Sequence, residues 1–476
     1  MFDLNKFQNL STEHQAFLQL LSIIALPIAS TPLAQCANVA SIPVPDGDPQ
    51  WTSRSIKLNL LDLVKEKWLV IDSNRFSIPD DMLDAIMLYS LESNTYQRLY
   101  NAIKEIFKAK ISYSGKQVWN TWENAIADIR MTLFFGDQLS LKSQLSDVNA
   151  QFEYIRRGNC EPLKEILGDS PTQNCLDLLA DDILVATVLP YYSSSCLFSL
   201  ENCDEIWTAM LKRRTTLKDD NLRNVLNALI AEQCLVRGDY NNFPERPSNT
   251  FYSALWTHSD STRLLLTGQY DQALERYDQG IRLLRKSTKQ PTDIYQNDIF
   301  EVLHFLQTLS NLNKEKISAI EKVHDALSGT YIAYFLISAY AEMINSGDDS
   351  ELLTEIDLLK NSNDPYICLT ILLLTNWAGI TPEQEWIDKS YQLHKKSYTN
   401  GYYWLAAEFA EAIGRHLPKD NDDKPTYTEL AKQQHKTITT RSLFDLITPE
   451  DRWKRSLNAL NILAGGEKDK QKKEKK

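Results

Sequence analysis

The sequence predicts a predominantly all-α protein, because glycine and proline are scarce and apolar residues recur with helical spacing over most of the chain. The 476 residues include 15 glycines and 17 prolines, and 43% are hydrophobic. This composition is typical of a folded chain, and the frequent Leu, Ala, Glu and Lys favour helix. A chain of this length holds about three domains, or one extended helical array with a small domain.

Residues 1–80 are predicted to form the small domain. An apolar-periodic run from Ser11 to Leu26 indicates a first helix, and the trio Ser30-Thr31-Pro32 begins a second. A third helix is expected over 52–66, followed by a hairpin with strands at 68–71 and 75–78. Three helices and a hairpin in this order are the plan of a winged helix-turn-helix domain, so we predict a winged-helix-like fold here.

The third helix of such a domain is the one that can enter a DNA groove. A helical wheel puts Ser55, Asn59, Asp62 and Glu66 on its solvent face, which is neutral to acidic. Four basic residues flank that face and are candidate contacts to nucleic-acid phosphates: Arg54, Lys57, Lys65 and Lys67. The formal net charge of −12 argues against general coating of nucleic acid, so a protein contact or a packing role is the alternative.

From residue 81 to 465 the chain shows helical patterns separated by short polar turns, which predicts an all-α region. The clearest segment is 264–284, where Gly268 and Tyr270 open a helix. In that helix the small Ala273 and Gly280 lie seven residues apart, with Tyr277 between them. Small residues at this spacing let a preceding antiparallel helix pack closely, and the segment resembles the second half of a tetratricopeptide repeat. We therefore expect a tetratricopeptide-like α-solenoid.

Two weaker patterns support a repeat. A similar turn at Gly238 lies 30 residues before Gly268. The sequence Thr-Pro-Glu, with a tryptophan at the same offset, occurs at Thr381 and again at Thr448, 67 residues later and close to two periods of about 34. Because Thr-Pro-Glu is also a common helix start, the match has a simpler alternative. Residues 466–476 are rich in lysine and glutamate and are expected to form a charged flexible tail.

The sequence contains none of the catalytic, metal-binding or cofactor-binding motifs for which we searched. The seven cysteines include no Cys-x-x-Cys pair, and the seven histidines lack metal-ligand spacing. Phosphate-binding loops, dinucleotide fingerprints and nucleophile elbows are also missing. We therefore predict no catalytic residue, no metal and no cofactor. Scattered cysteines and the lack of an apolar stretch of about 18 residues predict a cytoplasmic protein without a membrane span.

Three segments add a family resemblance. They are the winged-helix-like stretch from Leu58 to Ile78, the segment GYYWLAAE at 401–408 and the closing WKRSLNAL at 453–460. Together with the helical middle they are similar to the amino-terminal arm of bacterial Swi/Snf-type helicase-like ATPases. Members of that family continue into a motor with nucleotide-binding motifs, and this chain contains none of those motifs. The resemblance therefore implies a regulatory arm and transfers no catalytic residue.

The sequence thus predicts a non-catalytic protein-interaction scaffold or regulatory arm associated with a DNA-translocating Swi/Snf-type ATPase. Its expected partners are proteins, with a helicase-like ATPase first among them. Two alternatives remain open: a free-standing tetratricopeptide-like adaptor, and a winged-helix DNA-binding regulator in which the repeats act as a sensor. DNA is the less supported partner, and no membrane contact is expected.

Overall fold

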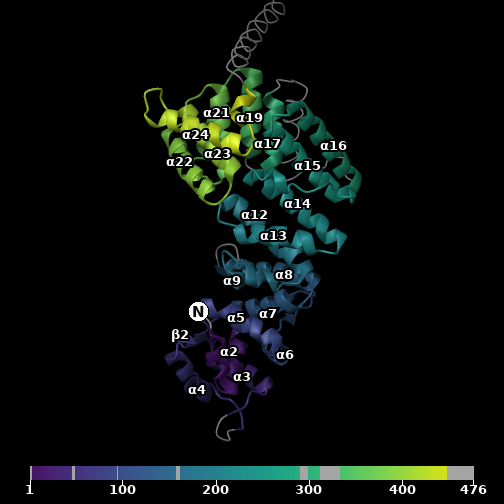
Figure 1. Ribbon diagram of the computed structural model, residues 1–476, viewed down its shortest axis with the longest axis vertical. Helices are drawn as coiled ribbons and strands as arrows, with labels where there is room; N and C mark the ends of the chain where they lie inside the picture. Colours follow the sequence, from purple (N-terminus) through teal and green to yellow (C-terminus); the bar gives the residue numbers. More distant parts are fainter. Residues whose placement is uncertain are drawn as a thin grey trace, which may run out of the picture. The chain divides into compact units, whose positions relative to one another are not determined.

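The computed structural model describes residues 3–44, 49–93, 95–156, 161–289, 299–310 and 333–447. It is predominantly α-helical, which confirms the predicted fold class at that level. The chain divides into two compact units, Met1–Pro190 and Tyr191–Lys476, drawn in purple to blue and in teal to yellow in Figure 1. The predicted boundary at residue 80 falls inside the first unit. The 453–460 motif, the Thr448 copy of Thr-Pro-Glu and the tail at 466–476 lie outside the described residues.

The first unit begins with short helices and a small sheet, continues through longer helices and ends in a π-helical turn. Its elements are α1 (Leu4–Gln8), α2 (Thr12–Ile24), β1 (Ile28–Ala29), α3 (Ser30–Val39), α4 (Ser53–Lys65), β2 (Val70–Asp72), β3 (Arg75–Ser77), α5 (Asp80–Glu92), α6 (Tyr96–Phe107), β4 (Lys110–Ile111), β5 (Gln117–Val118), α7 (Trp122–Phe135), α8 (Gln138–Arg156), α9 (Pro162–Leu167), α10 (Gln173–Asp177), α11 (Asp181–Ile183) and η2 (Leu184–Val188). Helix α12 (Leu189–Ser199) leads into the second unit.

The predicted hairpin is present as β2 and β3, and a third strand joins it. Ser73 and Asn74 both have positive φ (49° and 63°), the backbone conformation that a two-residue turn between twisted strands requires. The sheet order is β1-β3-β2, all antiparallel, with the fully buried Phe76 of β3 opposite Ile28 and Ile71. Sequence patterns did not predict β1, because two residues are too few to show an alternation.

The core of the first unit continues beyond residue 80. One apolar cluster takes in side chains of α2, α3 and α4 together with Ile86, Leu99 and Met131. Arg130 of α7 is 2% exposed and donates hydrogen bonds to the carbonyls of Ile23 (3.0 Å) and Ile166 (2.9 Å), so it joins α2, α7 and α9. The expectation of an all-α region after residue 80 was wrong in one place, since β4 and β5 form a short antiparallel hairpin.

The second unit is built from helices and two short 3-10 turns. Its described elements are α13 (Asp204–Thr216), α14 (Asp220–Arg237), η3 (Tyr240–Asn242), α15 (Thr250–Leu266), α16 (Tyr270–Thr288), α17 (Ile299–Ser310), α19 (Ala333–Ser346), α20 (Ser350–Leu358), α21 (Pro365–Ala378), α22 (Gln384–Thr399), α23 (Tyr403–His416), α24 (Asp423–Thr437) and η4 (Leu443–Leu446). The Thr-Pro-Glu sequence at Thr381 was interpreted as a helix start with Thr381 as its cap, but α22 begins three residues later with Glu383 as its N-cap.

Successive helices of this unit pack as hairpins, most extensively α15 with α16, α23 with α24, and α22 with α23. In addition, α14 packs against α23, although the two are far apart in the sequence. Hydrogen bonds also join the residues before α23 to the segment between α12 and α13: Asn400 Nδ2 donates to the Leu200 carbonyl (2.7 Å) and Tyr402 Oη to the Glu201 carbonyl (2.8 Å). In a linear solenoid each repeat contacts its neighbours alone. The second unit instead closes on itself.

The segment that follows α24 crosses two helix ends of the same unit. The Arg441 amide donates to the Leu266 carbonyl (2.7 Å) at the end of α15. A β-carbon added at Gly268 would lie 2.5 Å from the Arg441 side chain, and one added at Gly238 would lie 2.8 Å from Ile438. The two glycine turns 30 residues apart, which the sequence pattern singled out, are therefore the places where residues 438–441 approach the backbone.

Candidate functional site

Helix α4 carries the residues for which the sequence predicted contacts. Thr52 and Ser55 form a capping box at its start, in which Thr52 Oγ1 accepts from the Ser55 amide (3.1 Å) and Ser55 Oγ accepts from the Thr52 amide (2.8 Å). Ile56, Leu60 and Leu63 are buried, with exposed fractions of 1% or less, and fix the helix to the core of the first unit. The opposite side of α4 is consequently held toward solvent.

The exposed side of α4 forms a continuous stripe with helical spacing, which we call the α4 stripe. Its members are Arg54, Lys57, Leu58, Leu61, Asp62 and Lys65. Leu58 is 62% exposed and Leu61 is 42% exposed. A lone exposed leucine on a protein surface is ordinary, but two on one helix face, with basic residues before and after them, form the amphipathic pattern of an interaction surface.

The structure corrects the predicted orientation of this helix. Ser55 and Asn59, expected on the solvent face, are half-buried: Ser55 is engaged in the capping box, and the Asn59 carbonyl lies 3.2 Å from His14 Nε2 of α2. Asp62 and Glu66 are exposed as expected. The stripe is therefore turned by about one position from the predicted face, because α2 packs beside Asn59.

All four predicted basic residues are exposed. Lys65 forms an ion pair with Asp62 (2.7 Å), one turn before it. The side chains of Arg54 and Lys57 make no hydrogen bond or ion pair with another described residue and can take a partner. Lys67 follows the end of α4 with φ of 66°, so it does not belong to the stripe. Three of the four candidates are thus brought together on one face.

The two leucines at the centre of the α4 stripe, Leu58 and Leu61, limit the kind of partner that the stripe can bind. A recognition helix reads base edges with hydrogen-bond donors and acceptors, which leucine side chains lack. Leucines can make apolar contacts, and Arg54, Lys57 and Lys65 around them can pair with carboxylates or phosphates. The arrangement favours an apolar protein surface with acidic residues at its margin over sequence-specific reading of DNA.

The predicted repeat-packing residues lie where α15, α16 and α17 meet. Ala273 and Gly280 of α16 are buried, and Tyr277 is half-buried between them, packed on Ala254 of α15. The Tyr277 ring stacks on His304 of α17, with 4.5 Å between ring centroids. Gly268 forms the turn before α16, and the Tyr270 carbonyl accepts from Gln307 Nε2 of α17 (2.6 Å).

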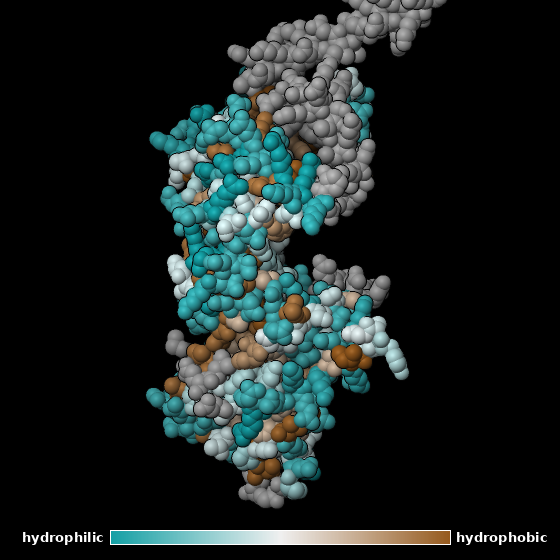
Figure 2. All heavy atoms as spheres, turned by 90° about the vertical axis from the view of Figure 1, so that its right-hand side faces the viewer, coloured by the Kyte–Doolittle hydropathy of each residue, from teal (hydrophilic) through white to brown (hydrophobic). Residues whose placement is uncertain are grey.

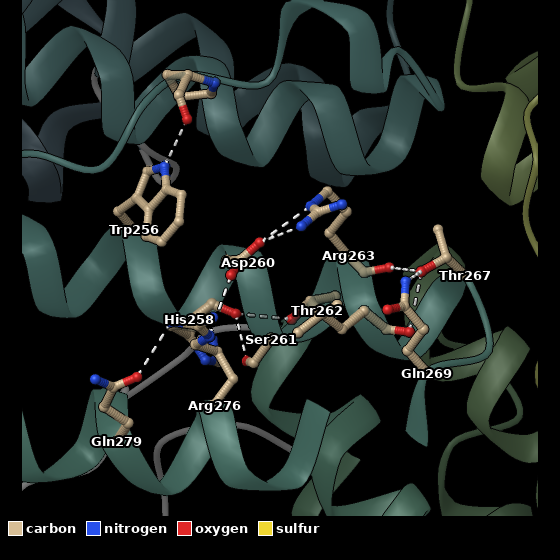
Figure 3. Close-up of polar contacts among 12 residues, drawn as sticks. Trp256, His258, Asp260, Ser261, Thr262, Arg263, Thr267, Gln269, Arg276 and Gln279 are labelled. Atoms are coloured by element: carbon tan, nitrogen blue, oxygen red, sulfur yellow. Dashed lines mark hydrogen bonds and ion pairs between the residues drawn. The ribbon is translucent and has the colours of Figure 1, made fainter. Parts of the chain in front are cut away.

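A buried polar network crosses the same helices (Figure 3). The Asp260 carboxylate, 4% exposed, pairs with Arg263 on its own helix (2.6 Å) and with Arg276 of α16 (3.2 Å), which also donates to Gln279 (3.2 Å). Two arginines around one buried carboxylate satisfy its charge and fix the register of α15 against α16. The sequence patterns did not single out this network, because its members are spread over two helices.

Beside this network lies a serine and histidine pair of the kind found in hydrolases. Ser261 Oγ is 2.8 Å from His304 Nε2, and the pKa of His304 is held well below its usual value by burial and by the nearby His258. Both side chains are almost completely buried, and Ser261 Oγ also donates to the His258 carbonyl (2.6 Å). In the observed conformation this buried pair joins α15 to α17.

One pocket of about 670 Å³ lies in the second unit, between the end of α12, the start of α21 and α22. Phe198, Pro365 and Leu393 line it together with Lys389 and Lys396. Both lysines are already paired: Lys389 with Glu385 (3.2 Å) and Lys396 with Glu201 (2.8 Å). The pocket therefore offers apolar surface without an unpaired cation, and nothing in its lining selects a particular ligand.

Neither a metal centre nor a membrane-spanning helix is found among the described residues. Within the described ranges, His, Cys, Asp and Glu side chains form no group of three that could hold a metal ion. None of the described helices is both long enough and apolar enough to cross a bilayer. On the face shown in Figure 2, hydrophobic residues form separate patches among mostly hydrophilic ones.

The chain matches no known protein-family model, no curated protein and no solved structure at a significant level. The resemblance to the arm of Swi/Snf-type ATPases is therefore carried by the sequence segments alone.

Proposed function

We propose that this chain is a non-catalytic protein-interaction arm and that the α4 stripe is one of its contact surfaces. The resemblance of its segments to the arm of Swi/Snf-type ATPases makes a helicase-like ATPase the partner to test first. The element order from α2 to β3 and the sheet order β1-β3-β2 support a winged-helix-like domain that presents α4. The α15–α16 hairpin with its small residues supports a tetratricopeptide-like helix pair within the second unit.

The exposure of Leu58 and Leu61 at the centre of the α4 stripe carries this proposal. Burying both against a partner removes apolar surface worth about 2 kcal/mol from water, which corresponds to about 30-fold in affinity. The basic residues of the stripe complement an acidic margin on that partner and would mainly raise the association rate. A DNA-reading helix would instead present polar side chains at this position.

The test is capture of partners by the tagged full chain from its native cells, followed by mass spectrometry and an ATPase assay of the eluate. The variant L58E/L61E is compared with the wild type and with the matched control Leu139→Glu, which alters a leucine of α8 that is 78% exposed. We expect a helicase-like ATPase with the wild type and with the control, and at least about tenfold less of it with L58E/L61E. Equal recovery in all three would contradict a role for the stripe.

Two other outcomes separate the alternatives. Stripe-dependent recovery of proteins without ATPase activity would favour the free-standing adaptor. Binding of the purified chain to duplex DNA at low salt, with a steep salt dependence that the variant K57E/K65E loses, would favour the DNA-binding regulator. The interaction arm predicts no such binding, since the net charge of the chain is −12 and its stripe is centred on leucines.

A further inference from the structure

The sulfur of Cys203, in the second unit, contacts three polar side chains. It is 3.2 Å from Arg237 Nη2, 3.3 Å from Tyr402 Oη and 3.7 Å from Gln233 Oε1. Cys203 is the N-cap residue of α13, whereas Arg237 is the last residue of α14 and Tyr402 the residue before α23. Three parts of the chain thus meet at one sulfur atom, and the residue is 2% exposed.

The thiol of Cys196 in α12 forms a hydrogen bond with this sulfur. Tyr402 Oη contacts both the Cys196 carbonyl (3.2 Å) and the Cys203 sulfur, so the two cysteines share one neighbour. A hydrogen bond from the Cys196 thiol and the positive charge of Arg237 outweigh burial and lower the pKa of Cys203 to about 6. Burial instead raises the pKa to about 12 in Cys36, Cys175 and Cys368, and also raises that of Cys234. Of these five cysteines, Cys203 alone has a lowered pKa, which favours its thiolate form.

We propose that Cys203 and Cys196 form a redox-modification site, in which a peroxide oxidises Cys203 and Cys196 then closes a disulfide. This inference is independent of the partner proposed above. It rests on the guanidinium of Arg237 against the Cys203 sulfur and on the neighbouring Cys196, which together supply a nucleophile, a cation and a second thiol. Both cysteines are buried, so the proposal requires an oxidant as small as hydrogen peroxide.

The chemistry balances with hydrogen peroxide as the oxidant. The Cys203 thiolate attacks one peroxide oxygen, the O–O bond breaks, and the leaving hydroxide takes a proton from solvent to become water. The sulfur has lost two electrons and is a sulfenic acid. The Cys196 sulfur then attacks it, the S–O bond breaks, and the Cys196 proton leaves with the hydroxide as a second water. Two thiols and one peroxide thereby give one disulfide and two waters.

Oxidation would change the contact that closes the second unit. Arg237 is 8% exposed, and besides the Cys203 thiolate it pairs with Asp204 (3.0 Å). Its guanidinium also lies over the rings of Trp207 (5.5 Å) and Tyr402 (5.7 Å). A disulfide is neutral, so Arg237 loses a buried counter-charge at the point where α13 and α14 meet the start of α23. The expected consequence is a looser contact between α14 and α23.

The experiment treats the reduced full chain with hydrogen peroxide at several pH values, blocks free thiols by alkylation and maps the cysteines by mass spectrometry without reduction. We expect a peptide pair linked by a disulfide between Cys196 and Cys203. Cys36, Cys175, Cys234 and Cys368 should remain free thiols and be recovered in alkylated form. The oxidation rate should rise about tenfold per pH unit below about pH 6 and level off above about pH 7. An unperturbed thiol would still gain rate up to about pH 8.5.

Two variants complete the test. In Cys196→Ser, Cys203 should stop at the sulfenic acid, which dimedone traps, and in Cys203→Ser, Cys196 should stay reduced. Hydrogen exchange in the oxidised wild type should increase over α14 and the start of α23. Oxidation of Cys203 no faster than that of the fully buried Cys368, or a rate that keeps rising to pH 8.5, would overturn the proposal without recourse to any variant.

Discussion

At the scale of single residues, the second unit contains a buried carboxyl group that has no cationic partner among the described residues. Glu408 of α23 is fully buried and accepts hydrogen bonds from Trp404 Nε1 (3.2 Å), Ser442 Oγ (3.2 Å) and the Leu443 amide (3.1 Å). No arginine or lysine pairs with it among the described residues. Burial raises its pKa to about 8, against the hydrogen bonds that lower it, so the group is largely protonated at neutral pH.

This raised pKa makes stability depend on pH in a defined direction. Because the unfolded state ionises near pH 4.5 and the folded state near pH 8, folding is most favoured below about pH 4.5 and loses stability as pH rises through about 8. We expect Glu408→Gln, which stays neutral, to match the wild type near pH 4. Near pH 8 it should exceed the wild type by a few kcal/mol in the free energy of unfolding.

Urea unfolding of both proteins across this pH range measures the difference. The buried His304 and His435, whose pKa values burial lowers, affect both proteins equally and cancel in the comparison. Glu429→Gln changes an exposed carboxyl of α24 and serves as the control for the loss of one negative charge. A constant difference between wild type and Glu408→Gln at all pH values would mean that Glu408 is not protonated in the folded protein.

At the scale of elements, the helix ends at Gly238 and Gly379 allow a matched comparison. Both glycines are C-caps in the left-handed conformation, with φ of 68° and 74°. A β-carbon at Gly379 meets nothing within 4 Å, whereas one at Gly238 meets the side chain of Ile438 at 2.8 Å. The backbone requirement is therefore shared, and the close approach of the segment after α24 is specific to Gly238.

We expect Gly379→Ala to cost about 1–2 kcal/mol of unfolding free energy from backbone strain alone. Gly238→Ala should cost about 1–3 kcal/mol more, because the added methyl group meets Cβ of Ile438. That atom can move only together with the Ile438 backbone. Chemical denaturation of the two variants measures this difference. Equal costs would show that residues 438–441 yield easily and do not hold the end of α14.

At the scale of the whole molecule, the second unit is closed rather than linear. The packing of α14 on α23 and the Tyr402 contacts join the beginning and the end of that unit, while the first unit has its own core. Removing the last helices of a linear array would expose the new end alone. In a closed unit the same truncation also uncovers helices near its beginning.

A chain ending after Asn400 tests this arrangement. We expect amide hydrogen exchange to quicken in α14 and α21, which both pack against α23, and to stay unchanged in α2 and α7 of the first unit. A chain ending after Ile447 retains the described elements and is the control. Faster exchange confined to α21 and α22, with α14 still protected, would indicate that the closure contributes little to stability.

The sequence by itself determined the local structure of this protein well where a signal lies within one helix or one turn. Helices begin at Ser11 and Thr52 as expected, and the structure shows both residues as N-caps. The hairpin after α4 is present, and the Gly268 turn precedes α16. Capping, turn and periodicity signals depend on neighbouring residues, so they can be read without the fold. They failed at β1, which is too short, and at Thr381, where the helix starts later.

The tertiary structure alone decided which residues meet. The exposed face of α4 depends on how α2 packs beside Asn59, and a helical wheel does not contain that information. The Asp260 network, the Cys203 surrounding and the closure of α14 on α23 join positions that are distant in the sequence, and they follow no short pattern. Such contacts arise when separate apolar faces are buried together, because burial then determines which polar groups must find partners inside the protein.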